Sequence, residues 1–198
     1  TLRNRIGVSP MCMYSSAAGP ATDWHLVHLG SRAVGGAALI IAEATAVSPE
    51  GRITPGDAGL WADSHIEPLA RINRFIKQHG APPAVQLAHA GRKAGCAQPW
   101  SPLPRGTRTP EEGGWQPLGP SPIPFDSIYA TPTPLTEPQL ALLVRQWADA
   151  ARRAVAAGYE LIEIHAAHGS PLHSFSSPPA NTRPDRSGAS SDNPPPLP

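Results

Sequence analysis

The chain has 198 residues, enough for one domain with a hydrophobic core, and its formal net charge is +1. This near-neutral balance gives no reason to expect a nucleic-acid or membrane partner. No apolar run approaches the roughly 18–20 residues that a membrane-spanning helix needs. Two cysteines are too few for a disulfide framework, and no signal peptide is visible, so a cytoplasmic location is expected. The chain begins at Thr1, so we expect residues to precede it in the natural protein.

The first half of the chain alternates short apolar runs with amphipathic segments. Residues 38–42 form a continuous apolar run, which is typical of a strand buried on both faces of a parallel sheet. Thr22 or Asp23 can cap a first helix, and Ser64 can cap a second. The predicted elements, in order, are a strand at residues 6–11, a helix at 22–34, a strand at 38–42, a helix at 64–79 and a strand at 84–87.

Proline is unusually common in this chain, especially in its second half. It supplies 26 of the 198 residues of the whole chain, against a typical share of about 5%. Eleven prolines fall between Pro99 and Pro138, a stretch too long for an ordinary βα loop. We therefore expect an inserted subdomain at about residues 94–135. A third helix is predicted from Thr136 to Gly158, followed by a fourth strand at residues 159–165.

Four strands that alternate with helices imply parallel pairing and right-handed crossovers. A (β/α)8 barrel has eight strands and takes about 250 residues, so the predicted fold class is α/β, the first four βα units of a TIM barrel, over residues 1–169. A doubly wound sheet is the alternative. It is disfavoured because no Gly-x-Gly-x-x-Gly motif follows the first strand.

Functional residues of parallel α/β folds lie just past the carboxyl ends of the strands. Small or polar residues stand at all four predicted strand ends: Pro10 to Tyr14, Glu43-Ala44, Gln86 to Arg92 and His165 to Gly169. Each group alone is weak evidence for a functional site. Together at the same edge of the sheet, where the carboxyl ends of the strands lie, they predict a binding or catalytic site.

Three of these segments resemble the signature segments of the Old Yellow Enzyme family, in the family's order, and the likeness runs from Asn4 to Gly169. The cysteine in the first segment is similar to that of the thermophilic-type subclass. The segments are Ser9-Pro10-Met11-Cys12-Met13-Tyr14-Ser15, Gln86-Leu87-Ala88-His89-Ala90-Gly91-Arg92-Lys93 and Glu163-Ile164-His165-Ala166-Ala167-His168-Gly169.

The resemblance implies non-covalent FMN, which NADPH or NADH reduces and which then passes hydride to an activated alkene such as an enone. It implies a homo-oligomer for the full-length protein. By the same likeness Gln86 would hydrogen-bond the pyrimidine edge of the flavin, and Tyr14 would reach toward the substrate. His165 and His168 would bind the substrate carbonyl, where two imidazole donors stabilise developing negative charge. The implied flavin-lining residues are Pro10, Met11, Cys12, Ala44 and His165.

Simpler interpretations stay open for the same residues. His165 and His168 could be structural, or could be a metal pair with Glu163 or His173, which would make the protein a metal-dependent barrel hydrolase. Cys12 taken alone is more often a small buried apolar residue. Glu43 is expected to make a structural hydrogen bond.

After Gly169 the chain departs from the family pattern. Ser170 stands where the family has a tyrosine that donates a proton, Pro171 at a leucine and Pro194 at an arginine. We interpret residues 170–198 as a corrupted, disordered tail from a damaged or misread gene end, or else a genuine low-complexity end. Because strands five to eight and their phosphate site are missing, we expect the 198-residue chain alone to be an inactive, colourless fragment that associates through its open sheet edges.

Overall fold

The structure is a computed structural model that describes residues 1–188. Its main elements, in order, are β1 (Gly7–Val8), α1 (Asp23–Val34), β2 (Leu39–Ala46), α2 (Ile66–Gln78), β3 (Pro83–Ala88), β4 (Leu118–Gly119), β5 (Thr133–Pro134), α3 (Glu137–Ala156), β6 (Leu161–Ile164) and α4 (Pro171–Ser176). Short 3-10 helices lie at Pro49–Gly51, Asp63–His65, Gly91–Lys93 and Pro110–Glu112. The chain divides into two compact units. The first contains residues 1–49, 56–88 and 146–164, and the second contains the other described residues.

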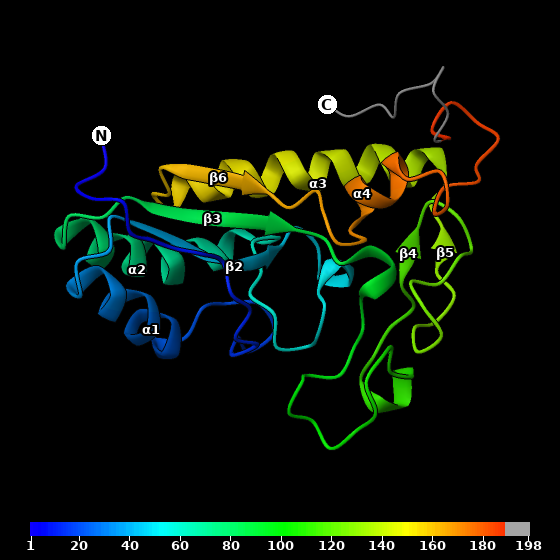
Figure 1. Cartoon of the computed structure of the whole chain (residues 1–198), viewed down its shortest axis with the longest axis horizontal. Helices are drawn as coiled ribbons and strands as arrows, with labels where there is room; N and C mark the ends of the chain where they lie inside the picture. The colour runs from blue at the N-terminus through cyan, green and yellow to red at the C-terminus, as the bar shows by residue number, and fades with distance from the viewer. Residues whose placement is uncertain (189–198) are drawn as a thin grey trace. The chain divides into compact units, whose positions relative to one another are not determined.

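A four-stranded parallel sheet forms the centre of the first unit (Figure 1). Its order is β1-β2-β3-β6, so the strands lie side by side in chain order. This confirms the α/β class and the parallel pairing predicted from the sequence. β1 has only two residues, whereas a strand was predicted at residues 6–11. Pro10 lacks an N–H and cannot continue the ladder, which accounts for the difference.

Helices α1 and α2 contact each other and pack on strands β2 and β3, on the same face of the sheet (Figure 1). The predicted N-cap is confirmed: Thr22 precedes α1 and forms a capping box with His25. Large, fully buried side chains of this unit come from the strands and from the inner face of α2: Ile40, Val85, Leu87, Ile72 and Ile76. Burial of each such side chain contributes about 1.5–3 kcal/mol, so this layer is the core.

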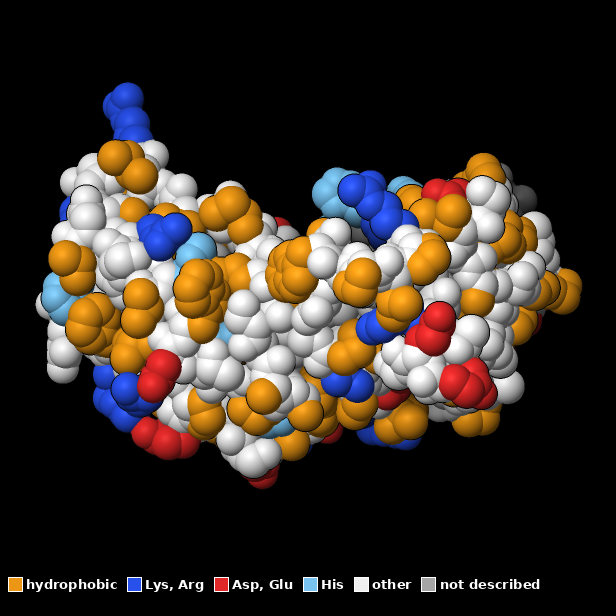
Figure 2. All heavy atoms as spheres, turned by 90° about the horizontal axis from the view of Figure 1, so that it is seen from below, with side chains coloured by type: hydrophobic (Ala, Val, Ile, Leu, Met, Phe, Trp, Pro, Cys, Tyr) orange, Lys and Arg blue, Asp and Glu red, His pale blue; other side chains and the backbone are white. Residues whose placement is uncertain are grey.

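The outer surface of α1 carries exposed apolar side chains, among them Trp24 and Val27. On the face drawn in Figure 2, hydrophobic side chains are interspersed with basic and acidic ones. That mixture agrees with the near-zero net charge. None of the helices within residues 1–188 combines the length and the hydropathy that crossing a membrane requires.

Strand β2 continues past the residue where the apolar run ends. It was predicted to stop before Glu43, but it extends to Ala46, and the pairing register with β3 shifts between Ala42 and Ala44. Glu43 is therefore the extra residue of a β-bulge. A bulge redirects the side chain it carries, and this one places a carboxylate in a buried position, 3% exposed.

Helix α3 has a narrower buried stripe than its sequence predicts. Two of its apolar side chains, Val144 and Val155, are 44% and 68% exposed. Ala150 and Ala154 are fully buried, and Leu143 is nearly so. Small side chains thus make the closest contacts of this helix, and the larger valines flank them.

The second unit holds the proline-rich segment that was predicted to be an insertion at about residues 94–135. Trp115 donates from its indole Nε1 to the carbonyl oxygen of Glu50 at 2.9 Å, and the Arg52 guanidinium lies 4.8 Å from the same ring. Cys96 forms an antiparallel bridge with Thr107, and β4 pairs with β5. Backbone and aromatic contacts therefore order this segment.

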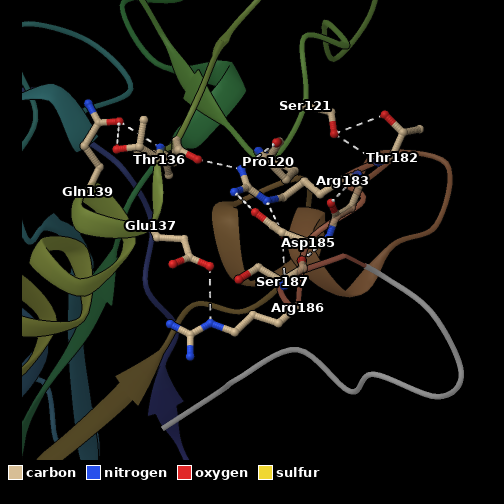
Figure 3. Close-up of polar contacts among 12 residues, drawn as sticks. Pro120, Ser121, Thr136, Glu137, Gln139, Thr182, Arg183, Asp185, Arg186 and Ser187 are labelled. Atoms are coloured by element: carbon tan, nitrogen blue, oxygen red, sulfur yellow. Dashed lines mark hydrogen bonds and ion pairs between the residues drawn. The ribbon is translucent and has the colours of Figure 1, made fainter.

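Residues 170–188 have a defined structure, which differs from the disordered tail that we expected from Ser170 onward. Ser170 stands at the N-cap position of α4, and Arg183 donates to the Leu135 carbonyl oxygen at 2.5 Å. Arg183 also donates to the Pro120 carbonyl oxygen at 3.2 Å (Figure 3). Arg183 also forms an ion pair with Asp185. These contacts order the segment despite its prolines. The departure noted at Pro194 lies outside the described residues.

Candidate functional site

Cys12 and Tyr14 follow β1 in the first unit and contact each other. The Tyr14 hydroxyl donates a hydrogen bond to the Cys12 sulfur, which also accepts the backbone N–H of Ala44. Burial, and then the carboxylates of Asp57 and Glu43, raise the pKa of the Cys12 thiol to about 11. Burial is likewise the main cause that raises the Tyr14 pKa far above its ordinary value. Both groups are therefore neutral at physiological pH.

The segment that carries Cys12 is held by the buried Glu43. Glu43 Oε2 accepts the backbone N–H of Met13 at 2.8 Å, and Glu43 Oε1 lies 3.2 Å from His25 Nε2. Tyr14 has a left-handed backbone, with φ of 50°, which a non-glycine residue adopts only when its surroundings hold it there. The Met13 contact next to it supplies part of that restraint.

Gln86 stands on β3 beside Ala44 of β2, and the two residues are register partners. On its other side Gln86 is the register partner of Glu163 on β6, and Gln86 Nε2 donates to Glu163 Oε1 at 2.8 Å. Cys12 and Ala44, predicted to line the flavin, and Gln86, predicted to hydrogen-bond its pyrimidine edge, are thus brought together across neighbouring strands. Pro10 and Met11 precede Cys12 in the same segment, and the Met11 side chain is half-exposed.

His165 and His168 lie in the second unit, directly after β6, and the structure brings their rings together. Their ring centroids are 5.4 Å apart, with the ring planes at 50°. His168 has a left-handed backbone, with φ of 56°. This turn lets two histidines three residues apart approach each other, as the spacing required.

Residues around His168 were missed by the sequence analysis. Lys93 Nζ donates to the His168 carbonyl oxygen at 2.7 Å and lies 4.6 Å from the centroid of the Phe125 ring. A Cβ on Gly169 would come within 2.7 Å of that ring, so only glycine fits there. No local pattern marks Lys93, because its partners are 32 and 75 residues further along the chain.

The metal-site alternative finds no ligand set in residues 1–188. In that part of the chain no group of three or more His, Cys, Asp or Glu side chains could hold a metal ion. Glu163, which we considered as a third ligand, binds Gln86 instead.

The chain belongs to the NADH:flavin oxidoreductase / NADH oxidase family, whose model matches residues 1–194. It is 47% identical over 195 residues to an NADPH dehydrogenase of Bacillus pumilus, covering 98% of this chain and 53% of that protein. Among solved structures it is similar to morphinone reductase, with a TM-score of 0.81 and 27% identity over 97% of this chain and 52% of that one. It is also similar to the Old Yellow Enzyme homologue from Zymomonas mobilis, with a TM-score of 0.79, 28% identity and the same coverage.

These likenesses confirm the predicted family and the TIM-barrel fold class. The chain spans about half the length of the proteins it matches. Its four parallel strands correspond to part of a barrel.

Proposed function

We propose that the protein carrying this chain is an FMN-dependent oxidoreductase that uses NADPH or NADH to reduce activated alkenes such as enones. The observation that carries the proposal is that Cys12, Ala44 and Gln86 lie side by side across neighbouring parallel strands, in a member of a flavin oxidoreductase family. When bound, FMN would supply hydride transfer between the nicotinamide and the alkene.

The chemistry of these residues fits a flavin. Ala44 has the smallest side chain that a non-glycine residue can have, so it leaves room beside Gln86. The Gln86 amide offers both a donor and an acceptor, which the pyrimidine edge of a flavin can match. The Cys12 thiol, neutral because burial raises its pKa to about 11, would contribute polarity without a negative charge beside the ring. Pro10 and Met11 would line the same ring with their backbone.

His165 and His168 would bind the substrate carbonyl oxygen. Two imidazole N–H donors aimed at one oxygen stabilise the negative charge that develops there as hydride adds to the alkene. His165 would also contact the flavin. Tyr14 would reach toward the substrate, although in this structure its hydroxyl is bound to the Cys12 sulfur.

The reductant is proposed from the relatives. The Bacillus pumilus relative is named an NADPH dehydrogenase, and morphinone reductase has been solved in complex with tetrahydroNAD.

The proposed proton donor differs from the tyrosine of the family pattern. Ser170 replaces the tyrosine of the family pattern, and its Oγ donates to the His165 carbonyl oxygen at 3.2 Å. A serine hydroxyl so engaged is a poor acid, so we propose that water supplies the proton.

The test uses the complete natural gene product. It should purify with a flavin spectrum and oxidise NADPH or NADH in the presence of an enone. A para-substituted phenol should perturb that spectrum, because its phenolate mimics the enolate. Replacing both His165 and His168 with Ala should remove roughly 2–4 kcal/mol of transition-state stabilisation, the scale of oxyanion donors. Unchanged alkene reduction in the double variant would contradict the assignment of the histidines, and a gene product that binds no flavin would contradict the function.

A polypeptide limited to these 198 residues is proposed to be inactive. β1 and β6 are the edge strands of its described sheet, and open edges pair with other chains. We expect this polypeptide to associate and to purify colourless. A yellow, monomeric preparation that melts cooperatively would show that half of the barrel suffices for flavin binding.

A further inference from the structure

Gln86 and Glu163 form a cross-strand pair within the first unit. They are register partners on the parallel strands β3 and β6, so their side chains emerge on the same face of the sheet. Gln86 is buried, 9% exposed, and its Nε2 lies 2.8 Å from Glu163 Oε1. The two residues are 77 positions apart in the sequence, so the contact depends on the sheet register.

The partner determines which way the Gln86 amide is turned. A glutamine amide has a carbonyl oxygen on one arm and an NH2 group on the other, and rotating it by half a turn exchanges the two. An ionised carboxylate can only accept hydrogen bonds, so Glu163 requires the NH2 arm to face it. The carbonyl oxygen Oε1 is then held on the opposite arm, and one proton of Nε2 is left after the bond to Glu163.

We propose that Glu163 is a positioning residue that fixes the Gln86 amide so that Oε1 is the acceptor offered to the flavin. This rests on the proposed function, in which Gln86 binds the pyrimidine edge of FMN. That edge presents one N–H, at N3, between two carbonyl oxygens. An amide held in this orientation accepts the N3 proton and can donate its second Nε2 proton to a neighbouring carbonyl. The reversed amide would set a donor against a donor.

The experiment measures the flavin N3 proton directly. FMN labelled with 15N at N3 is bound to the gene product, and the exchange of the N3 proton with solvent is followed by NMR. In the wild type the bond to Gln86 Oε1 should slow exchange relative to free FMN. In Glu163→Leu the amide loses its orienting partner, and exchange should become at least tenfold faster than in the wild type. Glu163→Gln, whose carbonyl can still accept from Gln86, should restore most of the protection.

Glu160→Leu is the matched control. This carboxylate lies three residues before Glu163 and pairs with Lys77 at 3.1 Å on a half-exposed surface, so its loss should leave the N3 exchange unchanged. If Glu163→Leu does not fold, Glu163→Ala, which adds no bulk, decides the question. Protection that persists in Glu163→Leu or Glu163→Ala, or an N3 proton unprotected in the wild type, overturns the inference while flavin binding itself still supports the proposed function. Absence of FMN binding in the wild type would contradict both the inference about Glu163 and the proposed function.

Discussion

His25 Nε2 lies 3.2 Å from Glu43 Oε1, and both side chains are 3% exposed. The backbone N–H of Thr22 donates to His25 Nδ1 at 2.9 Å, so Nδ1 is an acceptor and Nε2 is the nitrogen that faces the carboxylate. The other oxygen of Glu43 accepts the Met13 N–H. One buried carboxylate therefore joins the start of α1 to the segment that carries Cys12.

Glu43→Gln should destabilise the gene product by about 1–3 kcal/mol, the cost of a buried donor left unsatisfied. An amide has one acceptor oxygen, so its NH2 group must replace one carboxylate oxygen, beside either the Met13 N–H or His25 Nε2. Urea unfolding measures the loss. Glu67→Gln is the control, because Glu67 forms an exposed pair with Arg74 and its change should cost under about 1 kcal/mol. Equal losses in the two variants would show that the buried contacts of Glu43 contribute nothing particular.

The order of elements could be predicted from the sequence because local patterns carry it. The apolar run at residues 38–42 and the Thr22 cap both indicate elements that the structure contains. The bulge at Glu43 could not be predicted, since a register shift is a property of two strands and leaves no periodicity in one. The apolar pattern alone overestimates the length of β1, because Pro10 has no N–H with which to continue the ladder.

The candidate site divides in the same way. Cys12, Gln86, His165 and His168 could be named because motif resemblance marks them. Glu163 and His25 could not be assigned their contacts, because these depend on strand register and on helix packing across tens of residues. Residues that touch a ligand were thus easier to predict than the residues that hold them in place.

Cys12 should react slowly with alkylating reagents. Its pKa is raised from 9.0 to about 11, so at pH 8 its thiolate fraction is about a hundredfold below that of an unperturbed thiol. Asp57→Asn removes the largest charge contribution to that shift, so it should lower the pKa and speed the reaction. Peptide mapping after iodoacetamide treatment of the flavin-free protein separates Cys12 from the buried Cys96. Rapid alkylation of wild-type Cys12 at pH 7 would contradict the assignment.

Protonation of His89 should destabilise the fold in mild acid. His89 is 1% exposed, its Nδ1 accepts the Gly91 N–H at 2.9 Å, and burial lowers its pKa to about 4, against a smaller opposing effect of Glu50. Because the folded pKa lies below the unfolded one, stability is full above about pH 6.5 and is lost as the pH falls toward 4. The slope is at most about 1.4 kcal/mol per pH unit for this one group.

His89→Asn keeps an acceptor for Gly91 and removes the titration. Its free energy of unfolding should therefore change less between pH 6.5 and pH 4 than that of the wild type. Parallel pH profiles for the two proteins would mean that His89 does not titrate in this range.

Gly30 lies in the middle of α1, where glycine costs about 1 kcal/mol relative to alanine. A Cβ there would come within 2.8 Å of Phe75 Cε1 on α2. Gly30→Ala should therefore destabilise by about 1–3 kcal/mol, the cost of overpacking, despite the better helix propensity. With Phe75→Leu in the background the clash is relieved, and the same change should be neutral or stabilising. A stabilising Gly30→Ala in the wild-type background would show that the two helices separate easily.

Arg183→Lys should destabilise the segment after α4. The planar guanidinium donates to the Pro120 and Leu135 carbonyl oxygens and pairs with Asp185 (Figure 3). A lysine has a single ammonium group, which cannot make these contacts in the same planar arrangement. The expected loss is about 1.5–3 kcal/mol, the scale of a hydrogen bond that involves a charged group. Thermal unfolding measures it, and limited proteolysis should show earlier cleavage after residue 176.

Arg186→Lys is the matched control for that change. Arg186 lies three residues further on and pairs with Glu137 at 3.4 Å, with its side chain 78% exposed. A surface pair of this kind contributes under about 1 kcal/mol, and lysine can replace arginine in it.

The contact of Arg183 with Asp185 also holds the pKa of that carboxyl below its ordinary value. The contribution of this ion pair to stability is therefore lost as the pH falls through that lowered pKa. The difference between Arg183→Lys and Arg186→Lys should therefore be clear at pH 7 and should shrink in strong acid. Equal melting temperatures for the two variants at pH 7 would mean that the segment is held by its backbone and apolar contacts instead.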